Sequence, residues 1–376
     1  MSHVPFNRVA LAGPELQYIR QAVDRMHLSG DGVFTERCSR LLEQQLRVGR
    51  VMLTTSCTHA LEMAALLLEI QSGDEVVVPS YTFVSTINAF VLRGATPVFS
   101  DIRPDTFNLD ETQLERHVSK RTRAIVAVHY AGVACEMDTI LGIARRHDIP
   151  VIEDNAHGLF GRYKGRSLGS IGDMAALSFH ETKNVTCGEG GALILNDPSR
   201  VERAEILREK GTDRSRFFRG ECDKYTWVDI GSSYLPSEIL AAFLYAQLEA
   251  GERLQARRRD MWNRYFGELQ AWANRCGVRL PIVPSECEQS NHMFYLLMPS
   301  PAARQAIIAH VKTLGIHATF HYLPLHLSPM GRRFGGSAGD CPVTEDVSER
   351  IVRLPLSGGL TPEEQDRVLS AVTSFA

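Results

Sequence analysis

The sequence contains no long apolar run, because nothing in its 376 residues approaches the ~20 apolar residues that a membrane-spanning helix needs. The first residues, Met1 to Asn7, do not resemble a signal peptide. Neither sign of charge is in large excess. The formal net charge of −3 gives no indication of nucleic acid or an anionic membrane as a partner. We therefore expect neither nucleic acid nor a membrane as a partner of this protein.

Paired cysteines are also missing. The eight cysteines are scattered, and none forms a C-x-x-C pair, so neither a zinc ribbon nor a disulfide framework is predicted. His321 and His326 are close in sequence, but Pro324 between them prevents a regular helical pair of metal ligands. The sequence predicts no metal site and a reduced, cytoplasmic setting.

Strand-like and helix-like segments alternate through the first half of the chain, which predicts an α/β fold with a mainly parallel, seven-stranded sheet. The strand-like segments lie near residues 51–53, 75–79, 96–100, 123–129, 150–153, 174–179 and 191–195. Helical patterns cover residues 60–70, 84–92 and 137–147. After residues 237–274, which read as one or two helices, the pattern becomes that of a smaller α+β domain. We expect a large domain over residues 1–240, whose N-terminal segment can pack on the small domain, and a connecting helix and small domain over residues 241–376.

Lys183 is the residue that points most directly to a function. It lies between the apolar run Met174–Phe179 and the glycine-rich segment 188–191. A lysine that follows a buried strand can lose its proton through desolvation and attack a carbonyl, forming a Schiff base. The alternative is a solvated loop lysine, which is the more common situation for this residue type.

Two carboxylates, Glu153 and Asp154, end the short apolar strand Pro150–Ile152. In open parallel sheets, ligands bind outside the carboxyl ends of the strands. A carboxylate there can keep a pyridinium nitrogen protonated, so that a pyridoxal ring accepts electrons. The alternative is an ordinary helix N-cap. Taken together, Asp154 and Lys183 predict a site for pyridoxal 5′-phosphate (PLP).

A third segment can hold the phosphate of that cofactor. The strand at 51–53 runs into the polar residues 54–58 before a helix begins. Free N–H groups at a helix start, together with hydroxyls, form a phosphate cup, although Ser/Thr capping alone is the alternative. The segment Tyr81–Phe83 follows the next strand and can place an aromatic face on the ring, or else pack in the core.

These segments resemble the sugar aminotransferases of the DegT/DnrJ/EryC1/StrS family. The likeness rests on Ser-Cys-Thr (56–58), Pro-Ser-Tyr-Thr-Phe-Val-Ser-Thr (79–86), Glu-Asp-Asn-Ala-His-Gly (153–158) and Ser-Phe-His-Glu-Thr-Lys-Asn (178–184). Their order and spacing agree across nearly the whole chain. The resemblance implies a PLP-dependent transferase of fold type I that works as a homodimer with shared active sites.

The resemblance also implies a role for each cofactor residue. Lys183 would be the catalytic residue and carry the cofactor as a Schiff base, Asp154 would pair with the ring nitrogen, and His157 would lie near the phenolic oxygen. The remaining contacts would come from Ser178 and the backbone of Cys57 and Thr58 to the phosphate, from Phe83 stacked on the ring, and from Ser233. Many members read Asn-Tyr-Arg where this chain has Ser233-Tyr234-Leu235, so Ser233 replaces an asparagine that reaches the partner's phosphate.

Other segments resemble the members that act on dTDP-linked sugars, namely residues 129–138, 208–212, 224–227 and 321–326. The implied reaction takes the amino group of L-glutamate to the C4 ketone of a dTDP-4-keto-6-deoxyhexose and leaves 2-oxoglutarate. The side chains expected at the sugar nucleotide are Arg219, Tyr225, His321, Tyr322 and His326. Residues 214–219 mix arginines with phenylalanines and suit the diphosphate, although a solvated surface loop is the alternative.

Two other functions would use the same fold. Some relatives are sugar 3-dehydratases in which a histidine replaces the lysine, and here Lys183 is present. A PLP-binding regulator or a nucleotide-sugar-binding scaffold is the non-enzymatic alternative. Regulators of this fold carry a DNA-binding extension, for which we expect no room before residue 7. The sequence therefore favours transamination.

Overall fold

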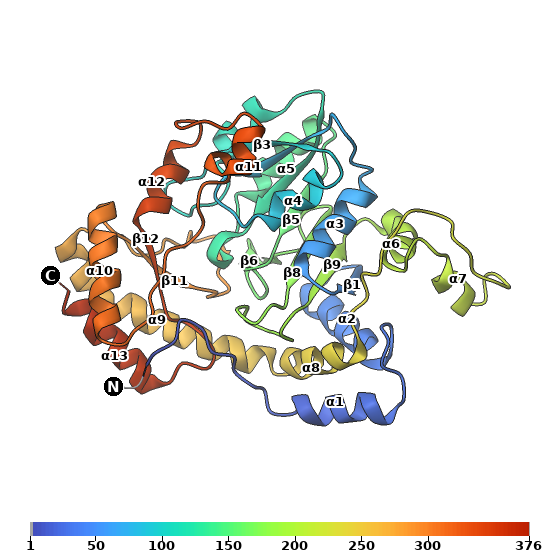
Figure 1. Ribbon diagram of the computed structural model, residues 1–376, viewed down its shortest axis with the longest axis horizontal. Helices are drawn as coiled ribbons and strands as arrows, with labels where there is room; N and C mark the ends of the chain where they lie inside the picture. Colours follow the sequence, from blue (N-terminus) through green and yellow to red (C-terminus); the bar gives the residue numbers. More distant parts are fainter. Residues whose placement is uncertain (1–2, 376) are drawn as a thin grey trace.

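The computed structural model describes residues 3–375, and a seven-stranded sheet lies at its centre (Figure 1). The strands are β1 (Arg50–Thr54), β2 (Glu75–Pro79), β3 (Thr96–Ser100), β4 (Thr122–Val128), β5 (Val151–Asp154), β8 (Met174–Ser178) and β9 (Gly191–Leu195). Their order is β1-β9-β8-β5-β4-β2-β3, and β9 runs antiparallel to both of its neighbours. The predicted mainly parallel sheet is confirmed.

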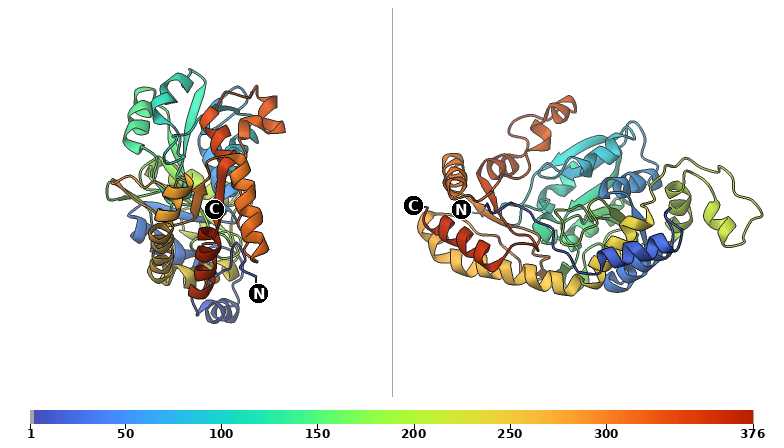
Figure 2. Two further views of the ribbon diagram at one scale, coloured as in Figure 1. Left: turned by 90° about the vertical axis from the view of Figure 1, so that its left-hand side faces the viewer. Right: turned by 60° about the horizontal axis from the view of Figure 1, so that its bottom comes forward.

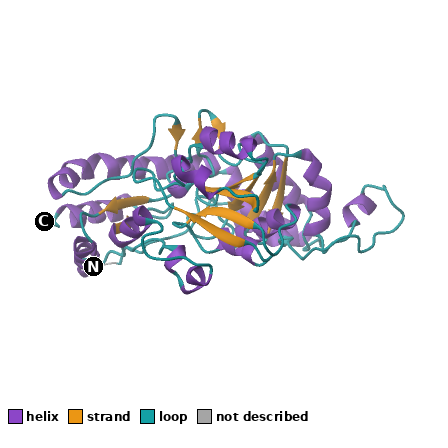
Figure 3. Ribbon diagram, turned by 90° about the horizontal axis from the view of Figure 1, so that it is seen from above, coloured by secondary structure: helices purple, strands orange, loops and turns teal. Residues whose placement is uncertain are grey.

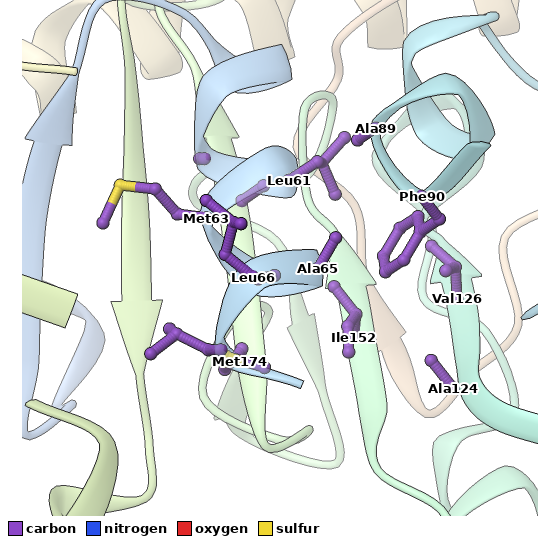
Figure 4. Packing of buried hydrophobic residues seen from close by; sticks show 14 of the residues in the cluster. Leu61, Met63, Ala65, Leu66, Ala89, Phe90, Ala124, Val126, Ile152 and Met174 are labelled. Carbon is purple, nitrogen blue, oxygen red and sulfur yellow. The ribbon is translucent and has the colours of Figure 1, made fainter. Parts of the chain in front are cut away.

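Helices cover both faces of this sheet, because its buried strands present apolar side chains to either side. On one face, α3 (Cys57–Leu67) and α4 (Ser85–Val91) pack through Leu61 and Phe90 against Val126 and Ile152 (Figure 4). On the other face, α5 (Met137–Arg146) packs against the alternate side chains of the same strands, and α2 (Val33–Leu46) packs against β1, β8 and β9. The sheet is therefore the middle layer of three.

Two consecutive helices, α8 (Glu238–Glu249) and α9 (Gly251–Cys276), lead from the sheet to the second unit and lie along one side of the molecule (Figure 2). The second unit contains the two-stranded sheet of β11 (Phe294–Leu297) and β12 (Ile351–Leu354), with α10 (Pro301–Thr313) and α13 (Pro362–Thr373). Thr361 and Glu364 form the reciprocal capping box that starts α13. The N-terminal segment joins this unit through Val4, whose N–H donates to the carbonyl of Gly315 at 2.9 Å.

Part of the second unit lies against the large sheet and not around β11 and β12. The helices α11 (Pro329–Arg333) and α12 (Pro342–Arg350) lie beside the β3 edge of the large sheet (Figure 1). The carboxylate of Asp101, just after β3, accepts hydrogen bonds of 2.8 Å from the N–H groups of Val343 and Thr344. The two units consequently share a buried cluster, which includes Tyr81, Tyr130 and Tyr295.

Residues 213–232 form an arm that projects from the large unit beyond α6 (Val201–Arg208), with α7 (Arg214–Phe218) at its far end (Figures 1 and 3). Residues 214–219, for which a solvated surface loop was the alternative to a diphosphate-binding segment, contain the short helix α7. The arm exposes Phe218, Tyr225 and Trp227, the last with 77% of its surface accessible. Such an apolar projection is typical of a segment that packs on another chain.

The remaining elements are short or peripheral. They are α1 (Glu15–Asp24), the 3₁₀ turns η1 (Glu111–His117), η2 (Tyr130–Gly132), η3 (Pro198–Arg200) and η4 (Leu325–Leu327), and a small sheet of β6 (Arg162–Tyr163), β7 (Arg166–Ser167) and β10 (Cys287–Glu288). None of the helices over residues 3–375 combines the length and apolar character needed to cross a bilayer.

Candidate active site

A pocket of about 810 Å³ opens where β5 and β8 end, between the large sheet and the second unit. It lies outside the carboxyl ends of parallel strands, as expected for a ligand site in an open α/β sheet. Nine of the side chains predicted for cofactor or substrate line it, namely Cys57, Thr58, Phe83, Asp154, His157, Ser178, Lys183, His321 and Tyr322. The segments that carry these residues are far apart in sequence, so the fold assembles the pocket.

Lys183 faces this pocket from the turn that follows β8. The turn is closed by backbone hydrogen bonds between Phe179 and the glycine-rich segment, including the Phe179 N–H to the Gly190 carbonyl at 2.8 Å. Burial lowers the pKa of the Lys183 ammonium, and the positive charge of Arg353 lowers it further, while Asp154 opposes the change. A lysine in this setting is more readily deprotonated, which makes it a better nucleophile.

The adjacent carboxylates Glu153 and Asp154 have different partners because successive side chains of a strand point to opposite faces. Asp154 lines the pocket, and Glu153 is fully buried on the other side of β5. Glu153 accepts hydrogen bonds from Nε2 of His129 at 2.8 Å and from the N–H groups of Gly169, Ile171 and Gly172 at 2.6 to 2.8 Å. Only Asp154 is therefore available to a ligand in the pocket.

Thr86 fixes the Asp154 carboxylate. The Thr86 hydroxyl donates to Oδ2 of Asp154 at 2.7 Å and is itself 2.8 Å from the hydroxyl of Thr82. Oδ1 of Asp154 accepts a hydrogen bond of 3.2 Å from the N–H of Ala156. The carboxylate is thereby oriented by neutral donors and keeps its negative charge available to a cationic partner.

The start of α3 forms one wall of the pocket. The Ser56 side chain caps the helix by accepting a 3.1 Å hydrogen bond from the N–H of His59. The next N–H groups, of Cys57 and Thr58, belong to the first turn, where no intrahelical acceptor exists. Gly191 of β9 lies directly behind this turn, and a Cβ there would be 2.3 Å from the carbonyl carbon of Ser56. The helix start is thus seated on the sheet with its N–H groups at the pocket, an arrangement that suits a phosphate.

Three buried histidines stand together on the opposite wall. The rings of His157 and His292 stack with centroids 4.2 Å apart, and His321 stacks on Tyr322 at 3.7 Å. Burial lowers the pKa of all three imidazoles well below the usual value, and the Lys183 charge acts in the same direction. These three imidazoles are accordingly neutral at pH 7.

His157 offers an unused polar atom to a ligand. Its Nε2 lies 3.3 Å from the hydroxyl of Tyr322, while its Nδ1 is buried and has no hydrogen-bond partner in the described chain. A buried nitrogen of this kind requires a partner. This nitrogen, the carboxylate of Asp154, the amine of Lys183 and the N–H groups of α3 are the polar groups that PLP needs. The residues therefore fit this cofactor.

Four predicted site residues do not line the pocket of their own chain. Arg219, Tyr225 and Ser233 belong to the arm or its base, and Arg219 pairs at 2.7 Å with both Glu205 and Glu221. The fourth, His326, is buried outside the pocket.

The Nδ1 atom of His326 lies 2.6 Å from the Ser80 hydroxyl, and its Nε2 lies 3.0 Å from Glu345. The predicted contact of His326 with substrate is therefore replaced by a structural one, because both ring nitrogens are engaged by the protein.

Sequence reasoning did not assign roles to Thr86, His292 and Arg353, all of which line the pocket. Thr86 lies in the segment 79–86, which carries part of the family resemblance. Its position shortly after β2 is the sequence feature that could have marked it as a site residue. His292 and Arg353 come from the second unit, and no local pattern marks them.

Comparison with known proteins identifies the family. The sequence profile of the DegT/DnrJ/EryC1/StrS aminotransferase family matches residues 10–373. The chain is 33% identical to GDP-perosamine synthase of Caulobacter vibrioides over 384 aligned residues, covering 99% of both chains. It superposes with TM-score 0.91 and 26% identity on the PMP form of the putative sugar aminotransferase Spr1654 from Streptococcus pneumoniae, covering 99% and 98% of the two chains.

A second solved structure has the same fold. DesV from S. venezuelae, in complex with a ketimine intermediate, gives a TM-score of 0.90 and 29% identity over 100% of this chain and 99% of that one. These likenesses confirm the predicted fold type I. The chain belongs to the DegT/DnrJ/EryC1/StrS aminotransferase family, and it is a sugar transaminase that uses PLP.

Proposed function

We propose that this enzyme transfers the amino group of L-glutamate to C4 of dTDP-4-dehydro-6-deoxy-D-glucose. The products are 2-oxoglutarate and dTDP-4-amino-4,6-dideoxygalactose. The observation that carries the proposal is that the Lys183 amine, with its pKa lowered by burial, faces the same pocket as the oriented carboxylate of Asp154. An activated amine and a fixed carboxylate at two strand ends are the groups that aldehyde-cofactor transamination requires.

The residues that would hold the cofactor surround the pocket. Lys183 would bind the aldehyde, Asp154 the ring nitrogen, and Nδ1 of His157 the phenolic oxygen. The phosphate would lie at the first turn of α3 and Ser178, with Phe83 against the ring. When bound, PLP withdraws electrons from the carbon that loses its proton and carries the amino group from one substrate to the other.

Lys183 would also move the protons of the reaction. It would take the proton from the α-carbon of L-glutamate and, in the second half, deliver a proton to C4 of the sugar. The imidazoles of His157, His292 and His321 would stay neutral during these proton transfers, so Lys183 would be the group that changes charge. The carboxylate of Asp154, oriented by Thr86, would pair with the ring nitrogen and favour its protonated form.

The sugar nucleotide would enter from the side of the second unit. His321 and Tyr322 line the pocket there and offer a stacked aromatic surface. We propose that Arg219, Tyr225 and Ser233 act in the pocket of a partner subunit, since all three lie outside the pocket of their own chain. The exposed aromatic side chains of the arm support this arrangement.

The nucleotide is tested by offering the purified enzyme a panel of dTDP-, GDP- and UDP-linked 4-keto-6-deoxy sugars with L-glutamate. GDP belongs in the panel because one relative is GDP-perosamine synthase. Mass spectrometry should detect a 4-amino product from the dTDP-sugar at the highest kcat/KM. Preferential amination of a GDP- or UDP-sugar would contradict the nucleotide assignment. NMR of the product then decides between the galacto and gluco configurations at C4.

A further inference from the structure

The segment Ser290–His292 of the second unit, just before β11, holds His157 of the pocket at two points. The Ser290 hydroxyl donates to the His157 carbonyl, and the Ser290 N–H donates to the Gly132 carbonyl at 3.1 Å. The ring of His292 stacks on that of His157 with an interplanar angle of 17°. Both the main chain and the side chain of His157 are therefore bound to this segment.

The same segment binds Asn184, which directly follows Lys183. Nδ2 of Asn184 donates to the Ser290 carbonyl at 2.7 Å and to Oε1 of Gln255 at 3.0 Å. Oδ1 of Asn184 lies 2.9 Å from Nδ1 of His292. One segment of the second unit consequently joins the turn after β8 to the loop after β5.

The polarity of these hydrogen bonds fixes the tautomer of His292. The Ser290 carbonyl only accepts, and the side-chain amides of Asn184 and Gln255 both approach it, the latter at 2.6 Å. Each amide must direct its NH₂ group at that carbonyl, so Oδ1 of Asn184 faces Nδ1 of His292. Since this oxygen also only accepts, Nδ1 must carry the proton, and the neutral ring has an unprotonated Nε2.

The long helix α9 holds the backbone of the segment through the buried Arg258. Its Nε donates to the Asn291 carbonyl at 3.3 Å, and one terminal nitrogen donates to the carbonyls of His292 and, at 3.2 Å, Leu356. Asn291 has a φ of 51°, in the left-handed region that asparagine tolerates better than most residues. The protein itself therefore fixes the turn that presents His292 to the pocket.

His292 is the ring in closest contact with His157. The centroids of Tyr130, His321 and Tyr322 lie 6.1 to 6.3 Å from that of His157, against 4.2 Å for His292. The 3.3 Å contact of Nε2 of His157 with the Tyr322 hydroxyl fixes one edge of the ring and not its plane. The stack with His292 supplies that second constraint.

We propose that His292 is a positioning residue of the active site, whose ring is fixed by Asn184 and in turn fixes the plane of His157. The inference rests on the proposed function, in which Nδ1 of His157 binds the phenolic oxygen of PLP. A hydrogen bond weakens steeply when its donor and acceptor lose alignment, so the plane of this ring determines how tightly the cofactor is held.

The first test measures the tautomer by NMR of the full-length enzyme, freed of cofactor and labelled with ¹⁵N in its histidine rings. The His292 signals are those absent from His292→Asn. We expect a proton on Nδ1 and none on Nε2 near neutral pH, and a loss of this preference in Asn184→Leu. A proton on Nε2 in the wild-type enzyme, or an unchanged tautomer in Asn184→Leu, would overturn the role of Asn184.

The second test separates the stack from the hydrogen bond by titrating the cofactor-free enzyme with PLP and following absorbance. His292→Asn keeps an N–H donor toward Asn184 and loses the ring, whereas His292→Phe keeps the ring and loses the donor. We expect His292→Asn to weaken PLP binding about 10-fold and His292→Phe less than about 3-fold. The reverse order, or equal affinities, would overturn the stack as the positioning contact.

A matched control is His310→Asn, which removes a second-unit imidazole that lies outside the pocket, with Nε2 3.0 Å from the Ala371 carbonyl. It should bind PLP as the wild type does. A loss equal to that of His292→Asn would show a general effect on the second unit and overturn the inference.

A double variant shows whether His292 acts through His157. If it does, His292→Asn should weaken PLP binding no further once His157→Ala has removed the ring that it positions. Losses that add would overturn the inference. Wild-type affinity in His157→Ala would overturn the proposed contact of His157 with the cofactor, and this inference with it. A weakened His157→Ala beside an unaffected His292→Asn would reject the role of His292 alone.

Discussion

The hydroxyl of Thr86 donates a 2.7 Å hydrogen bond to Oδ2 of Asp154, which joins the first turn of α4 to the end of β5 at the pocket. The donor is neutral, so it orients the carboxylate without cancelling its charge. In the proposed function, Asp154 would pair with the ring nitrogen without first being reoriented, which is the preorganisation that electrostatic catalysis relies on.

Asp154→Asn should bind the cofactor but lower kcat by roughly two to three orders of magnitude, because the loss of one ion pair at a reacting group costs ~2–4 kcal/mol. Thr86→Val should have a smaller effect, about 10-fold, since the carboxylate remains but is no longer fixed. Steady-state kinetics with the sugar nucleotide measures both. Near wild-type turnover in Asp154→Asn would mean that another group holds the nitrogen.

Lys183→Ala should abolish turnover while the fold persists, because both the covalent attachment and the proton transfers depend on this amine. Borohydride reduction of the wild-type enzyme followed by peptide mapping should place the pyridoxyl group on Lys183. Label on Lys164, Lys210 or Lys224 instead would contradict the assignment. Circular dichroism of the variant separates loss of chemistry from loss of structure.

Glu153→Gln should affect stability rather than chemistry, in contrast to the neighbouring Asp154→Asn. The buried Glu153 carboxylate accepts from one imidazole and three backbone N–H groups, and an amide NH₂ in its place would face some of those donors. We expect a loss of roughly 2–4 kcal/mol in the free energy of unfolding. Urea denaturation measures it, and an unchanged midpoint would show that the site tolerates the amide.

The three buried histidines predict a pH dependence of stability. Burial lowers their pKa in the folded protein, so below the unfolded value of about 6.5 the unfolded chain takes up protons that the folded chain does not. The free energy of unfolding should therefore fall as pH falls below about 6.5, by roughly 1.4 kcal/mol per pH unit for each histidine. His292→Gln should reduce the slope between pH 6.5 and 5 by one histidine's share. Urea titrations measure the free energy of unfolding at each pH. An equal slope against pH for the variant and the wild type would contradict this prediction.

Arg219→Ala tests the role of the arm. We expect this change to raise KM for the dTDP-sugar far more than KM for L-glutamate, because the diphosphate is the strongest ligand for an arginine on that substrate. Sedimentation should show a dimer, as shared sites require. A fully active monomer would exclude sharing, and an unchanged sugar KM would leave Arg219 as a surface residue paired with Glu205 and Glu221.

The strands of the large sheet could be predicted because each is a short apolar run ended by polar residues, and they differ from the predictions by at most one residue at either end. The start of α3 lies at Cys57 rather than at Ala60, because the cap at Ser56 allows polar residues in the first turn. Local patterns thus locate elements better than they locate their boundaries.

Local patterns predicted a site residue where its side chain directly follows a strand, as Asp154 does, or a strand and turn, as Lys183 does. The family resemblance, and no local pattern, predicted His321 and Tyr322, which also line the pocket. His292 and Arg353 reach the pocket through the folding of the second unit against the sheet, which no local periodicity encodes. His326 shows the opposite failure. Its neighbour Tyr322 lines the pocket, but the chain turns at Pro324 and carries His326 inward to Ser80 and Glu345.

That buried contact has a mechanical consequence for how the pocket can open. Ser80 ends the β2 region of the sheet, and both its side chain and its carbonyl bind the segment that carries His326, the latter through the Leu325 N–H at 3.0 Å. The segment from Leu325 through α12 therefore belongs to the same rigid body as the sheet, whatever its place in the chain. Arg304 of α10 also donates a 3.1 Å hydrogen bond to the Ser348 carbonyl of α12, so a motion of α10 away from the sheet would have to break one of these two connections.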